Sequence, residues 1–288
     1  MSERTRSPIR RPETARPRRK AAEDEAAPPS PDERLRIERG LDLLAVLGGA
    51  ELAAEEPSGR LVRWPGHGPA YNFAAGLRWT SDAVEERLGE LAASFRDVGE
   101  LPAVVVADGL SQPDDLVARL EQLGWLGIGR ETVHWTRRPV IVPHLDPTLR
   151  IEAVTAASVA EYERVERGIF GLAPMDGAER RAALETTLGD GRQRAFLVRL
   201  RGTPVATARL ASVDGLAAIH GVGVVPEQRG NGFARLVTAV ATRAGLATGH
   251  PLVWLSVDPG NEAAHRLYLS LGFEPAFGWQ RLIGTGSA

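Results

Sequence analysis

The 288-residue sequence predicts an α/β (α+β) protein in which a mixed, mostly antiparallel central sheet is flanked by helices and preceded by a smaller α/β domain. Three observations predict this fold. Apolar residues make up 43% of the chain, enough for cores in two domains of ordinary size. Residues 71–136 alternate strand and helix patterns, and residues 149–225 read as a strand, two helices and three successive strands. Residues 217–272 then read as strand, Gly-rich turn, helix, strand and helix.

The composition excludes several kinds of site. The chain has no cysteine, which excludes disulfides, thiolate zinc sites and a cysteine nucleophile, and we expect no metal. No apolar run approaches the roughly 18–20 residues that span a bilayer. The N-terminus is charged but lacks the apolar stretch of a secretory signal. We therefore expect a cytoplasmic protein with no membrane contact.

Residues 1–31 are rich in Arg and Pro and have almost nothing to bury, so we expect a disordered tail. The first 20 residues carry eight basic and two acidic side chains. A basic arm can contact nucleic acid. No aromatic residue interleaves this one, however, and Glu23, Asp24 and Glu25 follow at once. The balance favours a solvated tail over a nucleic-acid contact.

Residues 32–140 are expected to form the N-terminal domain. Its order is helix, loop, strand, helix, strand, helix, strand, with Ser81 and Asp82 capping the second helix. The predicted helices are 32–54, 83–98 and 113–123, the strands are 73–79, 103–107 and 131–136, and 57–69 is a loop. Three prolines in residues 139–147 mark the boundary that follows.

Residues 147–284 are expected to form the catalytic domain. Turns at Gly202-Thr203 and Asp214-Gly215 separate its three antiparallel strands. The predicted strands are 149–154, 195–200, 205–212, 216–225, 252–257 and the closing 273–283, and the first two helices are 157–168 and 178–188. Residues 116–125 and 267–273 both read as helix ends followed by Leu-Gly-aromatic, which favours duplicated domains over a solenoid.

A Gly-rich turn opens the long helix that follows the third antiparallel strand. It has the sequence Arg229-Gly230-Asn231-Gly232-Phe233-Ala234. Backbone N–H groups at a helix start are unpaired and lie at the positive end of the helix dipole, so they bind phosphate oxygens. The two glycines allow close approach of the backbone, and the arginine can add a charged contact. The Gly-Lys-Ser/Thr of a P-loop is absent, and the preceding antiparallel strands do not fit a Rossmann unit.

Two glycines interrupt the strand before this turn. Gly221 and Gly223 predict a bulge, since glycine within a strand often marks one. A bulge would separate this strand from its neighbour at 252–257 and leave the amides of Val222 to Val224, Gly223 included, free. An extended ligand that carries amides, such as pantetheine, could bind there.

These motifs resemble motifs A and B of the GNAT acyl-CoA N-acyltransferases. The two matching stretches are Val224-x-Pro226-x-x-Arg229-Gly230-x-Gly232-x-Ala234 and Asn261-x-x-Ala264-x-x-Leu267-Tyr268-x-x-x-Gly272-Phe273. The resemblance covers about residues 147–284, and residues 32–140 resemble a degenerate half of the same fold without the Gly-rich turn. It implies acetyl-CoA as acyl donor and a small-molecule or protein amine as acceptor, and it leaves a homodimer open. It also implies that residues 229–234 bind the CoA pyrophosphate and residues 222–224 the pantetheine.

The resemblance also implies catalytic roles. Asn261 stands at a helix N-cap, where capping and ligand contact are both open, and Tyr268 lies on the same helix face. The resemblance implies that Tyr268 protonates the departing thiolate. Family members often place a glutamate on the strand before motif A, but residues 217–221 lack one. His220 is the nearest titratable group, and a near-neutral pKa would let it accept the amine proton; packing between domains is the other interpretation. His265 is a weaker candidate.

Two functional hypotheses remain open at the level of the sequence. The first is an acetyl-CoA-dependent N-acetyltransferase in which the amine attacks the acetyl group directly. The second is a non-catalytic acyl-CoA-binding or regulatory module, which the missing strand glutamate favours and the retained Tyr268 opposes. Glu161, Glu163, Glu166 and Asp176 fall in a region that commonly contacts the acceptor in such folds, and we expect most of them to be solvated.

Overall fold

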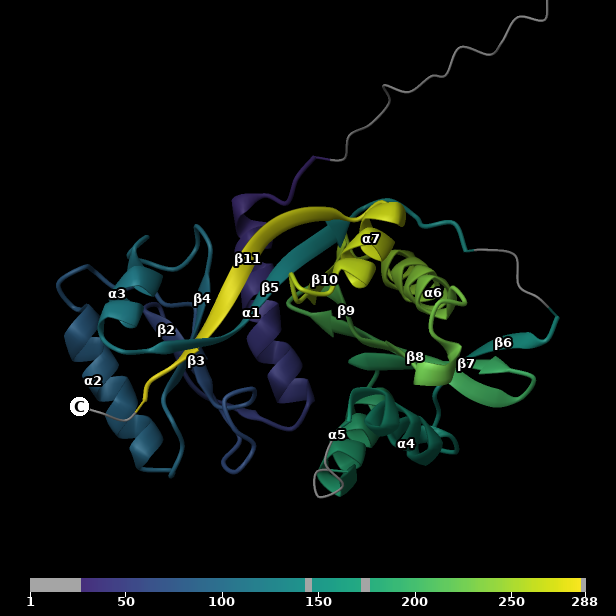
Figure 1. Cartoon of the computed structure of the whole chain (residues 1–288), viewed down its shortest axis with the longest axis horizontal. Helices are drawn as coiled ribbons and strands as arrows, with labels where there is room; N and C mark the ends of the chain where they lie inside the picture. Colours follow the sequence, from purple (N-terminus) through teal and green to yellow (C-terminus); the bar gives the residue numbers. More distant parts are fainter. Residues whose placement is uncertain (1–26, 143–146, 172–176, 286–288) are drawn as a thin grey trace, which may run out of the picture.

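The computed structural model describes residues 27–142, 147–171 and 177–285. Most of the predicted tail at 1–31 lies outside these ranges, and its last residue begins a helix. The strands of the described residues form one eleven-stranded sheet in the order β1-β2-β3-β4-β11-β5-β10-β9-β8-β7-β6. Two neighbouring pairs, β3–β4 and β9–β10, are parallel, and the others are antiparallel. This mixed sheet with flanking helices confirms the predicted fold class (Figure 1).

The first helix, α1 (Pro31–Leu47), begins at a capping box. The Ser30 hydroxyl accepts a hydrogen bond from the Glu33 amide at 3.2 Å, and the Glu33 carboxylate accepts one from the Ser30 amide at 2.8 Å. The helix was predicted to continue to residue 54, but it ends before Gly48. Gly49 has a φ of +124°, which a helix cannot accommodate, and the chain continues as β1 (Glu51–Glu56).

The rest of the N-terminal half follows the predicted order, with corrections to several bounds. The strand predicted at 131–136 begins at residue 126, and the helix predicted at 113–123 begins at residue 116. The loop predicted at 57–69 contains a strand, because that segment pairs with β1 and with β3. The strand predicted at 73–79 ends at residue 75, where Gly76 has a φ of +64°. The second helix takes Ala83 as its N-cap, with no side-chain capping bond from Ser81 or Asp82. The elements are β2 (Gly59–Arg63), β3 (Phe73–Ala75), α2 (Val84–Arg96), β4 (Ala103–Ala107), α3 (Leu116–Gln122) and β5 (Leu126–Thr136).

The C-terminal half begins with four successive antiparallel strands interrupted by two helices. Both hairpins are closed by pairs of residues with positive φ, Arg201-Gly202 and Asp214-Gly215, as two-residue hairpin turns require. The first turn therefore lies one residue earlier than predicted. The elements are β6 (Leu149–Ala153), α4 (Val159–Phe170), α5 (Gly177–Gly189), β7 (Gln193–Leu200), β8 (Thr203–Val213), β9 (Leu216–Val224), α6 (Phe233–Ala247), β10 (Val253–Val257), α7 (Glu262–Ser270) and β11 (Glu274–Ile283).

The last strand of each half pairs with the other half. β5 lies between β11 and β10, and β11 lies between β4 and β5. The β5–β11 ladder runs from the pair Glu274↔Trp135 to the pair Ile283↔Leu126. In Figure 1 these two strands form the long diagonal that joins the halves. One sheet thus runs through both halves, and the division into domains 32–140 and 147–284 stays a prediction.

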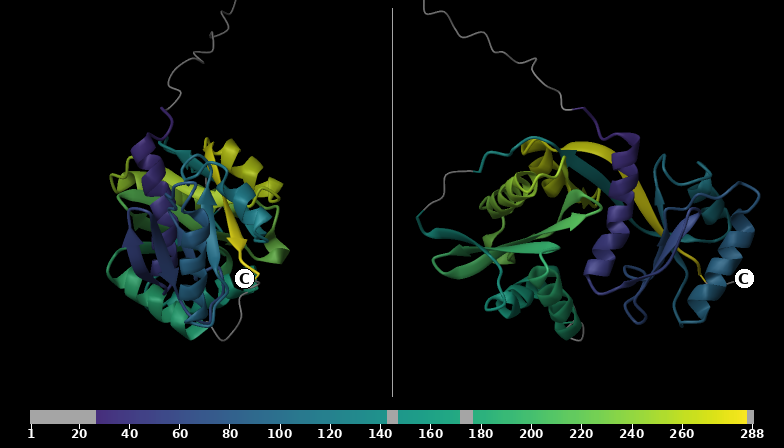
Figure 2. Two further views of the ribbon diagram at one scale, coloured as in Figure 1. Left: turned by 90° about the vertical axis from the view of Figure 1, so that its left-hand side faces the viewer. Right: turned by 180° about the vertical axis from the view of Figure 1, so that it is seen from behind.

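One hydrophobic core serves both halves. Trp135 of β5, Trp254 of β10 and Trp279 of β11 are at most 5% exposed and belong to the same cluster as Ile37 of α1. Helix α1 also contacts β8, β9 and α5, so α1, α4 and α5 share one face of the sheet, while α6 and α7 cover the other (Figure 2). None of the described helices has the length and apolar character to cross a membrane.

Candidate active site

A cleft opens where β9 and β10 separate. Their parallel pairing consists of Val253↔Ala217 and Trp254↔Ala218, and the strands diverge beyond these pairs. The resulting cleft has a volume of about 750 Å³. All the sequence-predicted site residues except Asn231 line it: Tyr268, His220, Val222, Gly223, Val224, Arg229, Gly230, Gly232, Phe233, Ala234 and Asn261. The structure therefore brings together residues that are up to 48 positions apart.

A bulge at Gly221 produces the separation. The β8–β9 register shifts between the pairs Thr207↔Gly223 and Arg209↔His220, and Gly221 has a φ of +60°. The Thr207 hydroxyl donates a hydrogen bond to the Gly221 carbonyl at 3.2 Å and so holds the bulge. Such a φ strains any residue with a Cβ, which is why glycine stands there.

Gly223 permits close contact between β9 and α4. A Cβ at this position would lie 2.4 Å from the Ile169 side chain and 2.9 Å from the Phe170 ring. Both of those side chains line the cleft. The glycine therefore lets the end of α4 form one wall beside the β9 backbone.

The Gly-rich turn presents unpaired amides at the start of α6. Gly230 and Gly232 each have a φ of +80°, and a Cβ at either would meet no atom within 4 Å. Gly232 is the N-cap of α6 and has no side-chain capping bond, so the N–H groups of the first turn remain available to an anion. Arg229 is exposed beside them. The Asn231 side chain bonds back to Gln228 on the same turn.

Helix α7 positions the amide and the tyrosine that the sequence singled out. Asn261 is its N-cap, and its side chain accepts a hydrogen bond from the Ala264 amide at 3.1 Å, which confirms the capping role. Tyr268 is 7% exposed, and burial raises its pKa to about 12. Its hydroxyl has no hydrogen-bond partner among the described residues. The phenol thus stays protonated at neutral pH and faces a cleft in which it has no competing partner.

A pair of histidines lies behind Tyr268. The Nδ1 atom of His265, on α7, lies 3.3 Å from the Nε2 atom of the buried His134, on β5. The ring centroids of His134 and Tyr268 are 6.2 Å apart. Burial lowers the pKa of His134. His265 does not line the cleft. Its contact with His134 instead joins α7 to β5.

His220 lines the cleft, but its surroundings disfavour the protonated form of its ring. Burial, together with the positive charge of Arg209 beside it, lowers the pKa of His220 to about 3. Its Nε2 atom is buried and has no hydrogen-bond partner among the described residues. The expectation of a near-neutral pKa therefore finds no support, and the catalytic assignment of His220 stays a prediction.

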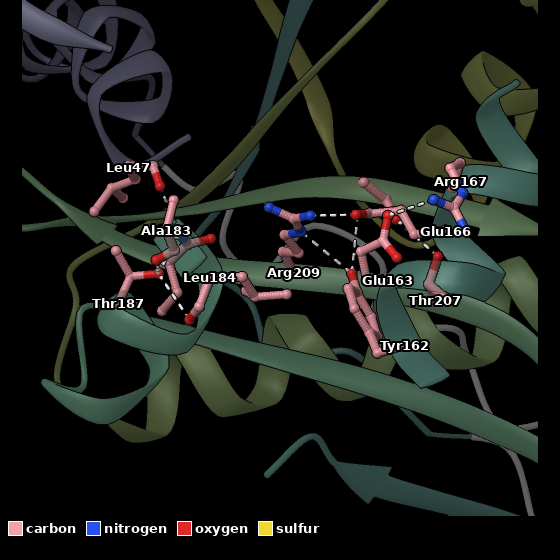
Figure 3. Close-up of polar contacts among 12 residues, drawn as sticks. Leu47, Tyr162, Glu163, Glu166, Arg167, Ala183, Leu184, Thr187, Thr207 and Arg209 are labelled. Carbon is pink, nitrogen blue, oxygen red and sulfur yellow. Dashed lines mark hydrogen bonds and ion pairs between the residues drawn. The ribbon is translucent and has the colours of Figure 1, made fainter. Parts of the chain in front are cut away.

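Arg209 belongs to a buried polar cluster on α4 and β8. It forms an ion pair with Glu166 and donates a hydrogen bond to the Tyr162 hydroxyl at 3.3 Å, as Figure 3 shows. The Tyr162 hydroxyl in turn donates to Glu166 at 3.1 Å. Contrary to expectation, Glu163 and Glu166 are buried rather than solvated. Asp176 lies outside the described residues.

The cleft lining also includes Glu131 and Ser256, which the sequence did not single out as site residues. Glu131 comes from β5 and Ser256 from β10, and the Ser256 hydroxyl donates a hydrogen bond to the Glu131 carboxylate. Glu131 was visible only as the first residue of a predicted strand. The pairing of β5 with β10, which joins residues far apart in the chain, brings it to the cleft.

The cleft fits acetyl-CoA as a substrate. The open turn and the uncapped start of α6 suit a pyrophosphate, and the separated edge of β9 suits the amides of pantetheine. No group of three or more His, Asp or Glu side chains within the described ranges is placed to hold a metal. The described lining offers hydrogen-bond donors, one tyrosine, Tyr268, and two carboxylates, those of Glu131 and Asp258.

Comparisons with known proteins point to one family. Residues 159–273 match the "Acetyltransferase (GNAT) family". A mycothiol acetyltransferase from Thermobispora bispora is 30% identical over 259 residues, which cover 81% of this chain and 80% of that protein.

Solved structures show the same fold. A GCN5-related N-acetyltransferase from Kribbella flavida superposes with a TM-score of 0.66 at 21% identity, covering 88% of this chain and 95% of that one. Another from Sphaerobacter thermophilus gives 0.62 at 16% identity, covering 87% and 90%. On the family match and the similarity to the Thermobispora protein, the chain belongs to the GNAT family and is an acetyl-CoA-dependent acetyltransferase.

Proposed function

We propose that the enzyme transfers the acetyl group of acetyl-CoA to a primary amine by direct attack, with Tyr268 as the general acid. The observation that carries this proposal is the convergence of three features on one cleft. These are the open edge of β9, the uncapped start of α6 and the buried phenol of Tyr268. Each suits a different part of the donor: pantetheine, pyrophosphate and thioester sulfur.

The roles follow from the chemistry of acyl transfer. An amine nitrogen attacks the thioester carbonyl, and a backbone N–H of β9 near Val222 stabilises the negative charge that develops on oxygen. The C–S bond then breaks, and Tyr268 gives its proton to the sulfur. Because its pKa is raised to about 12, Tyr268 holds this proton at neutral pH until it is needed.

The acceptor that the curated relatives use is the first amine to test as a substrate of this enzyme. Those relatives are mycothiol acetyltransferases, and the alignment with the Thermobispora protein extends over both halves of this chain. This favours a small-molecule amine over a protein amine. The cleft is lined by apolar side chains, such as Ile169 and Phe170, and by polar ones, such as Glu131 and Ser256, which agrees with an acceptor that has both apolar and polar parts.

Thiol release from acetyl-CoA, measured with a panel of amines that includes the acceptor of the mycothiol acetyltransferases, tests the proposal. We expect amine-dependent release with one acetylated amine formed per thiol. Tight CoA binding without amine-dependent release from any member of the panel would contradict it and favour the binding module.

A further inference from the structure

We propose that Glu131, on β5 of the N-terminal half, is the catalytic residue that accepts the proton lost by the acceptor amine. This inference rests on the proposed function, because it assigns a role in amine acetylation. It also makes the reaction depend on both halves: the N-terminal half supplies the proton acceptor, and the C-terminal half supplies the donor site and Tyr268.

The register of the sheet carries Glu131 to the cleft. β10 pairs with β5 from Val253↔Thr136 to Val257↔Thr132, and there β10 ends. Glu131 is the next residue of β5, so it is the first one beyond the end of its neighbour. Its side chain lines the cleft together with Ser256 and Tyr268.

Glu131 and Tyr268 reach the cleft from opposite faces of the sheet. Val133 and Trp135 pack in the core beneath α1, and Glu131 shares their face because side chains two residues apart on a strand point the same way. Tyr268 packs with Ile219 in the core on the other face, beneath α6 and α7. An acyl group held in the gap therefore has a carboxylate on one side and a phenol on the other. An amine can attack from the first side while the thiol leaves toward the second.

The other titratable groups in the cleft are less suited to this role. Asp258 is exposed, and its carboxylate accepts a hydrogen bond from the Gly260 amide at 2.7 Å, which commits it to the turn before α7. His220, with its pKa lowered to about 3, holds a proton too weakly. Tyr268 is protonated at neutral pH and can only donate.

Arg281 supplies the positive charge that an ionised carboxylate needs nearby. It lies on β11 opposite Gly129, diagonal to Glu131 and on the same face. Burial lowers the pKa of Arg281, and the negative charge of Glu131 opposes that shift. Arg281 has no ion pair within 4 Å among the described residues. Ser256, which donates to Glu131, completes the polar surroundings and fixes the carboxylate toward the cleft.

The proposed step balances in atoms and charge. The nitrogen lone pair of the neutral amine forms the N–C bond, and the carbonyl π electrons move to oxygen. When they return, the C–S bond breaks and its electrons leave with sulfur, which takes the Tyr268 proton. The nitrogen loses one proton to the Glu131 carboxylate. Transfer of that proton to the Tyr268 phenolate through solvent restores both groups.

Replacement of Glu131 by Gln tests the role with little change in shape. We expect kcat/KM for the amine at pH 7 to fall by about 10²–10⁴-fold, the usual contribution of a positioned base. CoA binding and the thermal midpoint should stay near those of the wild type. The loss should shrink as the pH rises, because hydroxide in solution can then take the proton that the variant no longer accepts. A merely structural role would not produce that pH dependence.

Two more variants keep the test decisive. Glu131→Asp, which retains the carboxylate, should recover part of the rate, and it replaces Glu131→Gln if that variant does not fold. Glu262→Gln removes an exposed carboxylate of α7 that does not line the cleft, and it should leave kcat/KM unchanged. A Glu131→Gln enzyme within about twofold of wild type over the whole pH range would overturn the inference. A wild-type enzyme that acetylates no amine would instead overturn the proposed function and this inference with it.

Discussion

In the C-terminal half the parallel strands β9 and β10 separate after two pairs, whereas in the N-terminal half the corresponding strands β3 and β4 are tied together. Beyond their pair Ala74↔Val104, Arg78 and Gln112 form a further parallel bridge. The Gln112 amide donates to the Leu77 carbonyl at 2.9 Å, and its carbonyl accepts from the Trp79 amide at 3.2 Å.

Side chains also fill the space beyond the β3–β4 pair, here called the N-terminal gap. Leu77 and Trp79 are buried there in one cluster with Val104 and Leu116. The C-terminal strand carries Gly221 and Gly223 at the equivalent positions, so its backbone bends away and leaves a cleft among the described residues. The same arrangement of two parallel strands thus forms a binding cleft where glycines follow the parallel pair, and a packed core where large apolar residues follow it.

The largest effect should come from Tyr268→Phe. We expect kcat to fall by about 10²–10⁴-fold because the thiolate then leaves without a proton, while the affinity for CoA stays the same. Thiol release and calorimetric CoA binding measure the two quantities. Tyr71→Phe, a tyrosine of the N-terminal half that does not line the cleft, is the control and should keep the wild-type rate. Full activity in Tyr268→Phe would remove the general acid from the mechanism.

Trp79→Ala should cost stability without affecting catalysis. Trp79 is 9% exposed, and truncation of such a side chain lowers the free energy of unfolding by about 3–5 kcal/mol. Denaturant unfolding measures the loss, and kcat and KM of the folded enzyme should not change, because this gap holds no substrate. A raised KM for acetyl-CoA would show that the N-terminal gap takes part in donor binding.

Gly232→Ala should weaken donor binding by a smaller amount. A Cβ at a φ of +80° costs about 1–2 kcal/mol, so we expect KM for acetyl-CoA to rise by about 5–30-fold as the turn leaves its binding conformation. Gly249→Ala is a matched control, since Gly249 has a φ of +87° and equally open surroundings but lies outside the cleft. It should lose similar stability at unchanged KM. Equal KM values in the two variants would contradict the phosphate role of the turn.

The smallest effect should come from His220→Gln. Because the pKa of His220 is lowered to about 3, the ring is already neutral from pH 5 upward and has no charge to lose in that range. We therefore expect kcat/KM to change by less than about threefold, with the same pH profile between pH 5 and 8. If the variant instead abolished an ionisation near pH 6–7, His220 would return as the proton acceptor.

The features that the sequence predicted are those fixed by neighbouring residues. The bulge follows from Gly221 and Gly223, and the start of α7 follows from Asn261, whose side chain reaches an amide three residues away. The Gly-rich turn is likewise local. All three appear where the spacing of the sequence placed them.

The features that it missed depend on contacts between distant segments. Glu131 and Ser256 are separated by 125 positions and meet only because β5 inserts beside β10. The low pKa of His220 results first from its burial and then from the charge of Arg209 in the neighbouring strand. No local sequence pattern predicts the contact of Glu131 with Ser256 or that of His220 with Arg209. The identity of the proton acceptor could therefore not be predicted from the sequence.

A crystal structure of the enzyme with CoA tests the central comparison most directly. We expect one CoA per chain, with its pantetheine between β9 and β10, its pyrophosphate on the amides of residues 230–234, and its sulfur beside Tyr268. We also expect Leu77 and Trp79 still to close the N-terminal gap. A CoA bound between β3 and β4, or one that bypasses the start of α6, would contradict the proposed donor site.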